Sequence, residues 1–220
     1  MVTFYVLVLA ATIATATLGN EVINPVIPVP RRRPGVILSE NTLAKKVLVD
    51  FEVFLELNCP DSKVTWPVLK RVAQDFAPKG VRLTVNQFAL PYHQYGYLST
   101  LAYYFINNNN ASLTVPYADA IFENIREFGL RSWTKTPIEM TKRLSEIAVS
   151  VGYEQGFNTT DILAFSGPVR TTWKYATRRG VSGTPWYFIN NVDLGISSSG
   201  TLSYETWADY LNGLLMGKKI

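Results

Sequence analysis

The stretch FEVFLELNCPDSKVTWPVLKRVAQDF, residues 51–76, decides the fold of this chain. It begins as an apolar run typical of an inner strand and continues with Trp66, Leu69 and Phe76 at the spacing of one helix face. The single cysteine, Cys59, lies at the junction. We therefore expect a strand to end and a helix to begin at Cys59, where free backbone N–H groups and the helix dipole favour a negative charge.

The composition indicates a globular protein with a full hydrophobic core. Of its 220 residues, 47% are hydrophobic and 13% are aromatic, which suffices for a core without metals or disulfide bonds. The net charge is +4, and the basic residues are scattered except for the triplet Arg31, Arg32 and Arg33. This pattern argues against a nucleic-acid-binding surface, so we expect no nucleic-acid partner.

The N-terminus predicts a secretory signal. Residues 1–19 contain no charged residue and carry an apolar segment over 4–11, with a cleavage point before Asn20. The alternative is a single membrane anchor, which the threonine-rich second half of the segment disfavours. Two Asn-X-Ser/Thr sequons, at Asn110 and Asn158, suit a secretory route and are candidate glycosylation sites. We expect a secreted protein with no membrane attachment once the signal is removed.

The segment 20–40 is predicted to be an extended arm. Four prolines between residues 25 and 34 break any helix or inner strand. Its arginine triplet is a candidate processing site or a contact for an anionic partner, and the simpler alternative is a solvated tail.

One cysteine cannot form a disulfide within the chain. In an oxidising compartment a leftover thiol indicates intermolecular pairing or reactivity, and the simpler alternative is a small buried hydrophobic residue. The only histidine, His93, has no acid or metal-type partner near it in the sequence. We expect a structural or solvent-facing role for His93, with proton transfer to or from Cys59 as the alternative, and no metal site.

Two separated motifs resemble the thioredoxin superfamily, in particular its DsbA-like branch. Cys-Pro-Asp-Ser at 59–62 is similar to the Cys-X-X-Cys motif of that family, with serine in the second cysteine position. Pro67 is similar to the proline that kinks the following helix. Gly-Thr-Pro at 183–185, before the aromatic run 186–188, is very similar to the loop that carries a cis-proline in the family.

The resemblance implies an α/β protein with a thioredoxin-like fold and an inserted helical subdomain. The first part of the core would cover residues 41–90, the helical insertion 91–167, and the second part of the core 168–220, with the cis-proline loop and a C-terminal helix. Local patterns agree with this division. They predict a strand over 81–90, helix N-caps at Thr136 and Ser203, a helix over 169–179, and a hairpin turn at 190–191.

The resemblance also implies the site. Cys59 and Ser62 would be catalytic, and the substrate-binding residues would be Pro60, Asp61, Thr184 and Pro185. With serine in the second position, the chain alone can neither hand over an internal disulfide nor release a mixed one, so a two-cysteine oxidase or reductase is excluded. What remains is single-thiol exchange at Cys59, with Ser62 as a hydrogen-bond donor to the thiolate.

We therefore predict a secreted protein that exchanges disulfides through one thiol, either isomerase-like or by forming a mixed disulfide with a protein client or glutathione. No cofactor is expected apart from glutathione as a co-substrate, and the sequence leaves the oligomeric state open. A different hypothesis is a redox-inactive, chaperone-like module that binds peptides or partner proteins in the cis-proline groove. A third is glutathione conjugation, as in kappa-type transferases, which would need Ser62 or an unrecognised group as the nucleophile.

Overall fold

The computed structural model describes residues 33–129, 132–196 and 202–217. The predicted signal peptide (1–19) and the predicted arm up to residue 32, with Arg31 and Arg32, lie outside these residues. Within the described ranges, no helix is long and apolar enough to cross a membrane.

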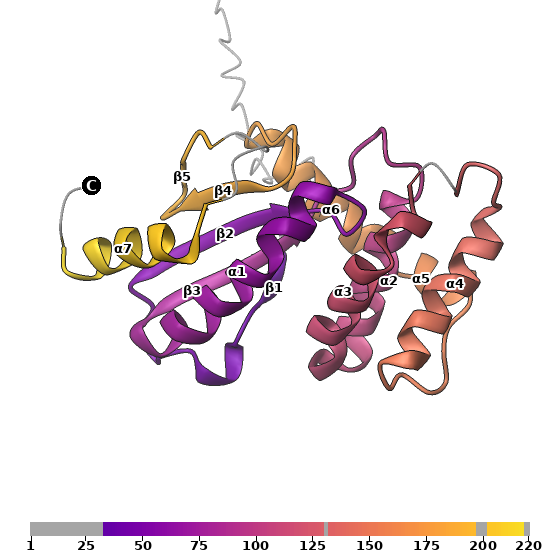
Figure 1. Cartoon of the computed structure of the whole chain (residues 1–220), viewed down its shortest axis with the longest axis horizontal. Coiled ribbons are helices and arrows are strands. Elements are labelled where there is room, and N and C mark those ends of the chain that lie inside the picture. The colour runs from indigo at the N-terminus through magenta and orange to yellow at the C-terminus, as the bar shows by residue number, and fades with distance from the viewer. Residues whose placement is uncertain (1–32, 130–131, 197–201, 218–220) are drawn as a thin grey trace, which may run out of the picture.

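The described strands form a five-stranded sheet in the order β1-β3-β2-β4-β5 (Figure 1). Strands β2 and β3 are parallel, and the other neighbouring pairs are antiparallel. The strands are β1 (Val36–Ile37), β2 (Val49–Leu55), β3 (Val81–Gln87), β4 (Trp186–Ile189) and β5 (Val192–Asp193). The predicted inner strand before Cys59 is therefore confirmed, because β2 lies at the centre of the sheet with a partner on each side.

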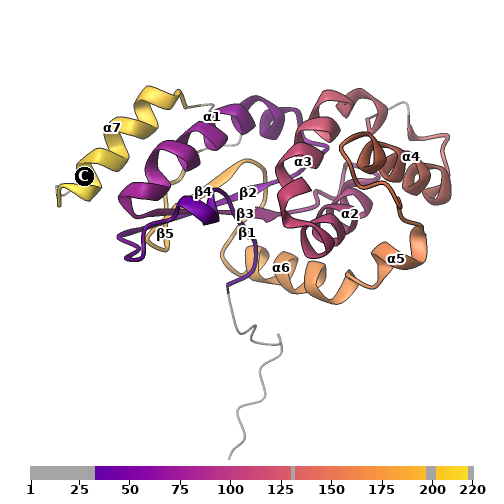
Figure 2. The same ribbon diagram turned by 90° about the horizontal axis from the view of Figure 1, so that it is seen from below.

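Helices cover both faces of the sheet. Figure 2 shows α1 and α7 together on one face and α6 on the other, while α2, α3, α4 and α5 form a block beside the sheet. The helices are α1 (Pro60–Phe76), α2 (Gly96–Asn109), α3 (Thr114–Glu123), α4 (Pro137–Ser150), α5 (Thr159–Leu163), α6 (Ser166–Arg178) and α7 (Tyr204–Leu215). Short 3-10 turns lie at Glu40–Thr42, Ala77–Lys79, Ala111–Leu113 and Ile125–Glu127. A helical block between β3 and α6 confirms the predicted helical insertion.

Strand β2 buries side chains on both of its faces, as its continuous apolar sequence predicts. Phe51 packs against Trp207 of α7, with ring centroids 4.7 Å apart. Phe54, on the opposite face, packs edge-on against Phe188 of β4 at 5.7 Å and belongs to a second cluster that includes Cys59. The two layers of helices are therefore held to the sheet by alternating residues of a single strand.

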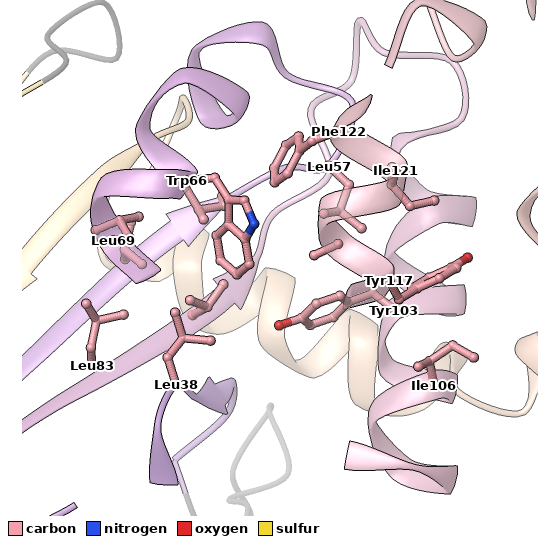
Figure 3. Close-up of a cluster of buried hydrophobic side chains, with 14 of the residues drawn as sticks. Leu38, Leu57, Trp66, Leu69, Leu83, Tyr103, Ile106, Tyr117, Ile121 and Phe122 are labelled. Carbon is pink, nitrogen blue, oxygen red and sulfur yellow. The ribbon is translucent and has the colours of Figure 1, made fainter. Parts of the chain in front are cut away.

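The main core continues from the sheet into the helical block. Figure 3 shows Trp66 of α1 beside Phe122 of α3, and their ring centroids are 5.9 Å apart. The Trp66 indole N–H donates to Asp119, which also accepts from Lys70 at 2.6 Å. The insertion thus shares its core with the thioredoxin-like part, because the same side chains contact both.

A buried ion pair fixes α6 against β2. Glu52 is 2% exposed, and its carboxylate accepts from Arg179 at 2.6 Å and from the Tyr175 hydroxyl at 2.8 Å. A buried carboxylate needs partners of this kind, because desolvating an unpaired charge costs several kcal/mol. The pair therefore determines where α6 can lie on this face of the sheet.

Local signals for helix ends and turns are confirmed. Thr136 and Glu139 form the predicted capping box of α4, and Ser203 caps α7 through the Thr206 backbone N–H. The hairpin turn is at 190–191, where both asparagines have positive φ angles of 48° and 69°.

Three boundaries differ from the sequence-based expectation. The strand expected over residues 81–90 ends at Gln87. Strand β1 pairs with β3 inside the segment predicted as an arm, because two residues are too few to show an alternating pattern. Gly35 precedes it with φ of 105°, and a Cβ there would lie 2.6 Å from the Asn86 side chain. Helix α6 starts at Ser166 instead of residue 169, which places Pro168 in its first turn, where a missing N–H costs no helical hydrogen bond.

We expect Trp207→Ala to lower the free energy of unfolding by about 3–5 kcal/mol, because a large buried aromatic side chain would leave a cavity. Trp207 is 1% exposed and also packs 5.1 Å from Tyr187. The matched control is Trp133→Ala, at a side chain that is 65% exposed, for which we expect a change within about 0.5 kcal/mol. Urea unfolding measures both, and equal losses would contradict the packing of α7 on β2.

Candidate thiol site

Cys59 is the N-cap residue of α1, with extended backbone angles of φ −90° and ψ 124°. Its carbonyl accepts from Lys63 N–H at 3.0 Å, which starts the helix, and its own N–H donates to the Glu56 carbonyl at 3.0 Å. Pro60 follows at the first helical position, where proline loses no hydrogen bond. The predicted junction of strand and helix at the cysteine is confirmed.

The thiol lies against the loop before β4. Cys59 Sγ donates to the Thr184 carbonyl at 3.3 Å, across 125 positions of sequence. The Thr184–Pro185 peptide bond is cis. Strand pairing brings the segments together, because Phe54 of β2 is opposite Trp186 of β4 and the loop therefore reaches the end of β2. The cysteine is 4% exposed, so only an edge of the residue meets solvent.

The predicted catalytic partner, Ser62, faces the interior. It is fully buried, and its hydroxyl oxygen accepts from the Glu56 backbone N–H at 3.2 Å. The hydroxyl proton is not used in that bond. Donation from Ser62 to a Cys59 thiolate therefore stays a prediction, since the observed hydrogen bond of the sulfur runs to Thr184.

The predicted substrate-binding residues fall into two groups. Pro60 and Asp61 are exposed at the start of α1, whereas Thr184 and Pro185 are buried in the loop beside the thiol. The structure brings both groups to Cys59, and their role in binding stays a prediction.

A buried carboxyl group lies directly behind the site and was missed by the sequence analysis. Glu56 is 0% exposed; one carboxylate oxygen accepts from Leu90 N–H at 2.9 Å and the other contacts His93 Nδ1 through a short hydrogen bond. Burial raises the pKa of Glu56 to about 7, although the hydrogen bonds from His93 and Leu90 lower it. Glu56 therefore changes charge near neutral pH.

The expected structural role of His93 fits this contact, and its acid partner lies 37 positions away in the sequence. Gly96 makes room for the carboxylate, because a Cβ there would lie 2.0 Å from a Glu56 oxygen. The signal that could have revealed the site is a glutamate in an otherwise apolar strand end, which must find a partner when buried.

Tyr92 is a further residue beside the thiol. Its ring packs edge-on against His93, with centroids 4.9 Å apart, and is 64% exposed. Partial burial raises the pKa of Tyr92, and the negative charges of Cys59, Glu56 and Asp61 raise it further. An exposed aromatic side chain thus stands at the edge of the site.

The other predicted sites lie away from the thiol. Both sequon asparagines are exposed: Asn110 follows α2 and accepts from Ser112, and Asn158 caps α5. Their glycosylation stays a prediction. Within the described residues, no group of three or more His, Cys, Asp or Glu side chains is placed to hold a metal ion.

We expect stability to fall between pH 4.5 and 7 because of Glu56. Its pKa is about 7 in the folded protein and 4.5 in the unfolded chain, so in this window the folded state holds a proton that the unfolded state has released. The contribution is fully present below pH 4.5 and is lost as the pH rises through about 7. Glu56→Gln should remove this loss, which is roughly 3 kcal/mol.

Denaturant unfolding at a series of pH values measures the difference between the two proteins. Glu154→Gln is the matched control, because Glu154 is exposed, and it should keep the pH dependence of the unchanged protein. Identical pH dependence in Glu56→Gln and the unchanged protein would contradict the raised pKa of Glu56.

No known protein family model matches the sequence, and no curated protein matches it. Solved structures do match. BdbD from Bacillus subtilis has a TM-score of 0.61 at 14% identity, covering 84% of this chain and 100% of that one. Mtb DsbA has a TM-score of 0.60 at 14% identity, and the match covers 82% of this chain and 92% of that one. The catalytic domain of Proteus mirabilis ScsC has a TM-score of 0.58 at 16% identity, and the match covers 79% of this chain and 87% of that one.

Identities this low show the fold alone. The resemblance found in the two sequence motifs therefore agrees with the arrangement of the whole described chain, including the helical insertion and the thiol at the start of α1. The chain therefore has a DsbA-like thioredoxin fold, in which residues 59–62 read Cys-Pro-Asp-Ser.

Proposed function

We propose that this protein exchanges disulfides through a single thiol, Cys59, with a protein client or glutathione. The proposal is carried by one contact: Cys59, at the start of α1, places its Sγ 3.3 Å from the carbonyl oxygen of Thr184. The sulfur lies at a helix N-terminus, where free N–H groups stabilise negative charge, and beside backbone groups that an extended peptide can contact.

The exchange step needs no cofactor. The thiol loses its proton to solvent, and the Cys59 thiolate attacks one sulfur of the client disulfide. A new S–S bond forms between Cys59 and that sulfur, while the old S–S bond breaks and its electron pair leaves with the other sulfur as a thiolate. Cys59 is oxidised to a mixed disulfide, and the departing half of the client is reduced.

Release of the mixed disulfide requires a thiol from outside the chain. The position of a second cysteine is held by Ser62, whose hydroxyl cannot attack a disulfide. In an isomerase-like exchange, another thiol of the client meets this requirement and resolves the bond. Without such a thiol the mixed disulfide persists, as in a lasting adduct with glutathione.

A secretory location is part of the proposal. It is supported by the charge-free apolar segment over residues 1–19 and by the two sequons. A further structural neighbour, at 16% identity and a TM-score of 0.55, is a periplasmic thioredoxin-like protein from Salmonella enterica serovar Typhimurium; it covers 83% of this chain and 90% of that one.

The second candidate function is a peptide-binding module without exchange. It is favoured by the low exposure of Cys59, at 4%, because a thiol that clients cannot reach would serve only as a buried hydrophobic residue. The two functions differ in whether a covalent adduct forms.

We expect incubation of the reduced protein with oxidised glutathione to give one glutathione per chain, bound to Cys59. Intact-mass spectrometry measures the adduct, and dithiothreitol should remove it. Cys59→Ala should form none. If unchanged protein forms no adduct while an unfolded sample does, the thiol is inaccessible in the fold and the peptide-binding module replaces the exchange function.

We expect Ser62→Cys to make the adduct transient, because a thiol at this position would displace glutathione and form an internal disulfide. Mass spectrometry over time should then show loss of the adduct with no added reductant, whereas the unchanged protein keeps it. The matched control is Ser203→Cys, at the exposed N-cap of α7, where an added thiol should leave the Cys59 adduct in place. An equally lasting adduct in Ser62→Cys and the control would contradict the role assigned to position 62.

A further inference from the structure

A pocket of about 650 Å³ opens beside the thiol site, between α6 and the segment that links β3 to α2. Its walls are formed by that linking segment, by one face of α6, and by Ser182, which precedes the cis-proline loop. The residues that define it are Phe88, Leu90, Tyr97, Arg170, Trp173 and Lys174. We call this the cationic pocket.

Two sets of lining residues connect the pocket to the surroundings of Cys59. Leu90 and Phe88 belong to the same buried cluster as Cys59, and Leu90 N–H donates to Glu56 behind the thiol. Ser182 also lines the pocket and is two residues before Thr184, whose carbonyl accepts from the thiol. The pocket therefore borders both the buried cluster around Cys59 and the segment that leads into the cis-proline loop.

The pocket offers aromatic surface and positive charge together. Trp173 is 44% exposed and stacks on Phe88, with centroids 6.1 Å apart and planes 7° from parallel. Arg170 and Lys174 are one helical turn apart on the same face of α6. Among the described residues neither cation takes part in a salt bridge with a carboxylate, and the pocket lining contains no acidic residue.

We propose that the cationic pocket binds a client peptide that carries an aromatic residue next to an acidic one, close to the disulfide to be exchanged. The aromatic side chain packs on Trp173, and the carboxylate lies between Arg170 and Lys174. The inference rests on the proposed exchange function only in its choice of a peptide client. Glutathione is disfavoured as the occupant because it has no apolar side chain to cover the aromatic wall.

Calorimetry with serine peptides tests binding without any exchange. The probe is Ac-Asp-Phe-Ala-Ser-Ala-Phe-Asp-NH2, which presents the acidic and aromatic pair on both sides of the position of the client cysteine. Counterparts carry Asn or Lys in place of both Asp residues. We expect the full chain to bind the acidic peptide roughly tenfold more tightly than the neutral one, as two partly exposed ion pairs allow. The preference should shrink at high salt.

Charge reversal on α6 tests the assignment to this pocket. Arg170→Glu combined with Lys174→Glu should make the basic peptide the preferred ligand. The matched control reverses two exposed cations of the helical block, Arg126→Glu with Lys142→Glu, and should keep the acidic preference. Trp173→Ala should weaken binding of all three peptides by a similar factor, because it removes the shared aromatic surface.

Each outcome decides the proposal. Equal affinity for the acidic and basic peptides, no binding of any peptide, or a preference that survives charge reversal on α6 would overturn it. Tighter binding of S-methylglutathione than of the acidic peptide would assign the pocket to glutathione instead. Because the peptides contain no sulfur, binding can succeed when the glutathione adduct fails, so the pocket and the exchange function are tested separately.

Discussion

The antiparallel pairing of β4 with β2 is the interaction on which the site depends. Helix α1 begins five residues after β2 ends, so Cys59 is held close to the sheet, and the register of Phe54 with Trp186 brings the Thr184 carbonyl within 3.3 Å of its sulfur. Neighbouring strands are about 4.8 Å apart. The loop that enters β4 beside the end of β2 therefore lies close to the segment that follows β2, which contains Cys59. A slip of one residue would turn the side chains of β4 to the opposite face and remove the contact.

Two buried carboxylates, one on β2 and one directly after it, shape the surroundings of the thiol in different ways. Glu52 stays paired with Arg179 and holds α6 in place, whereas Glu56 accepts hydrogen bonds from Leu90 and His93 and its pKa rises to about 7. One carboxylate therefore positions the helix wall of the cationic pocket, and the other positions the linking segment opposite. Burial of charge is costly, and here the required partners are the elements that border the site.

The sequence predicts the parts of this fold that depend on residues close together in the sequence. The strand before Cys59, the capping box at Thr136 and the turn at 190–191 each follow from local patterns, and the fold class follows from the two motifs taken together. The apolar surroundings of Glu56 in the sequence indicate that it needs a buried partner, but the choice of His93 as that partner and the cationic pocket could not be predicted, because they depend on packing between segments far apart in sequence. The two-residue β1 was missed because it is too short to carry a pattern.

Ser62 has a structural role at this site but cannot take the chemical role of a second cysteine. Its oxygen accepts the Glu56 N–H and so supports the turn from β2 into α1, while it supplies no sulfur to resolve a mixed disulfide. In a protein with one thiol, release of a bound client would wait for an external thiol, and the lifetime of the complex would depend on how easily that thiol reaches the S–S bond. Noncovalent contacts in the cationic pocket would then govern which clients are captured, and the low exposure of Cys59 would govern how long they are held.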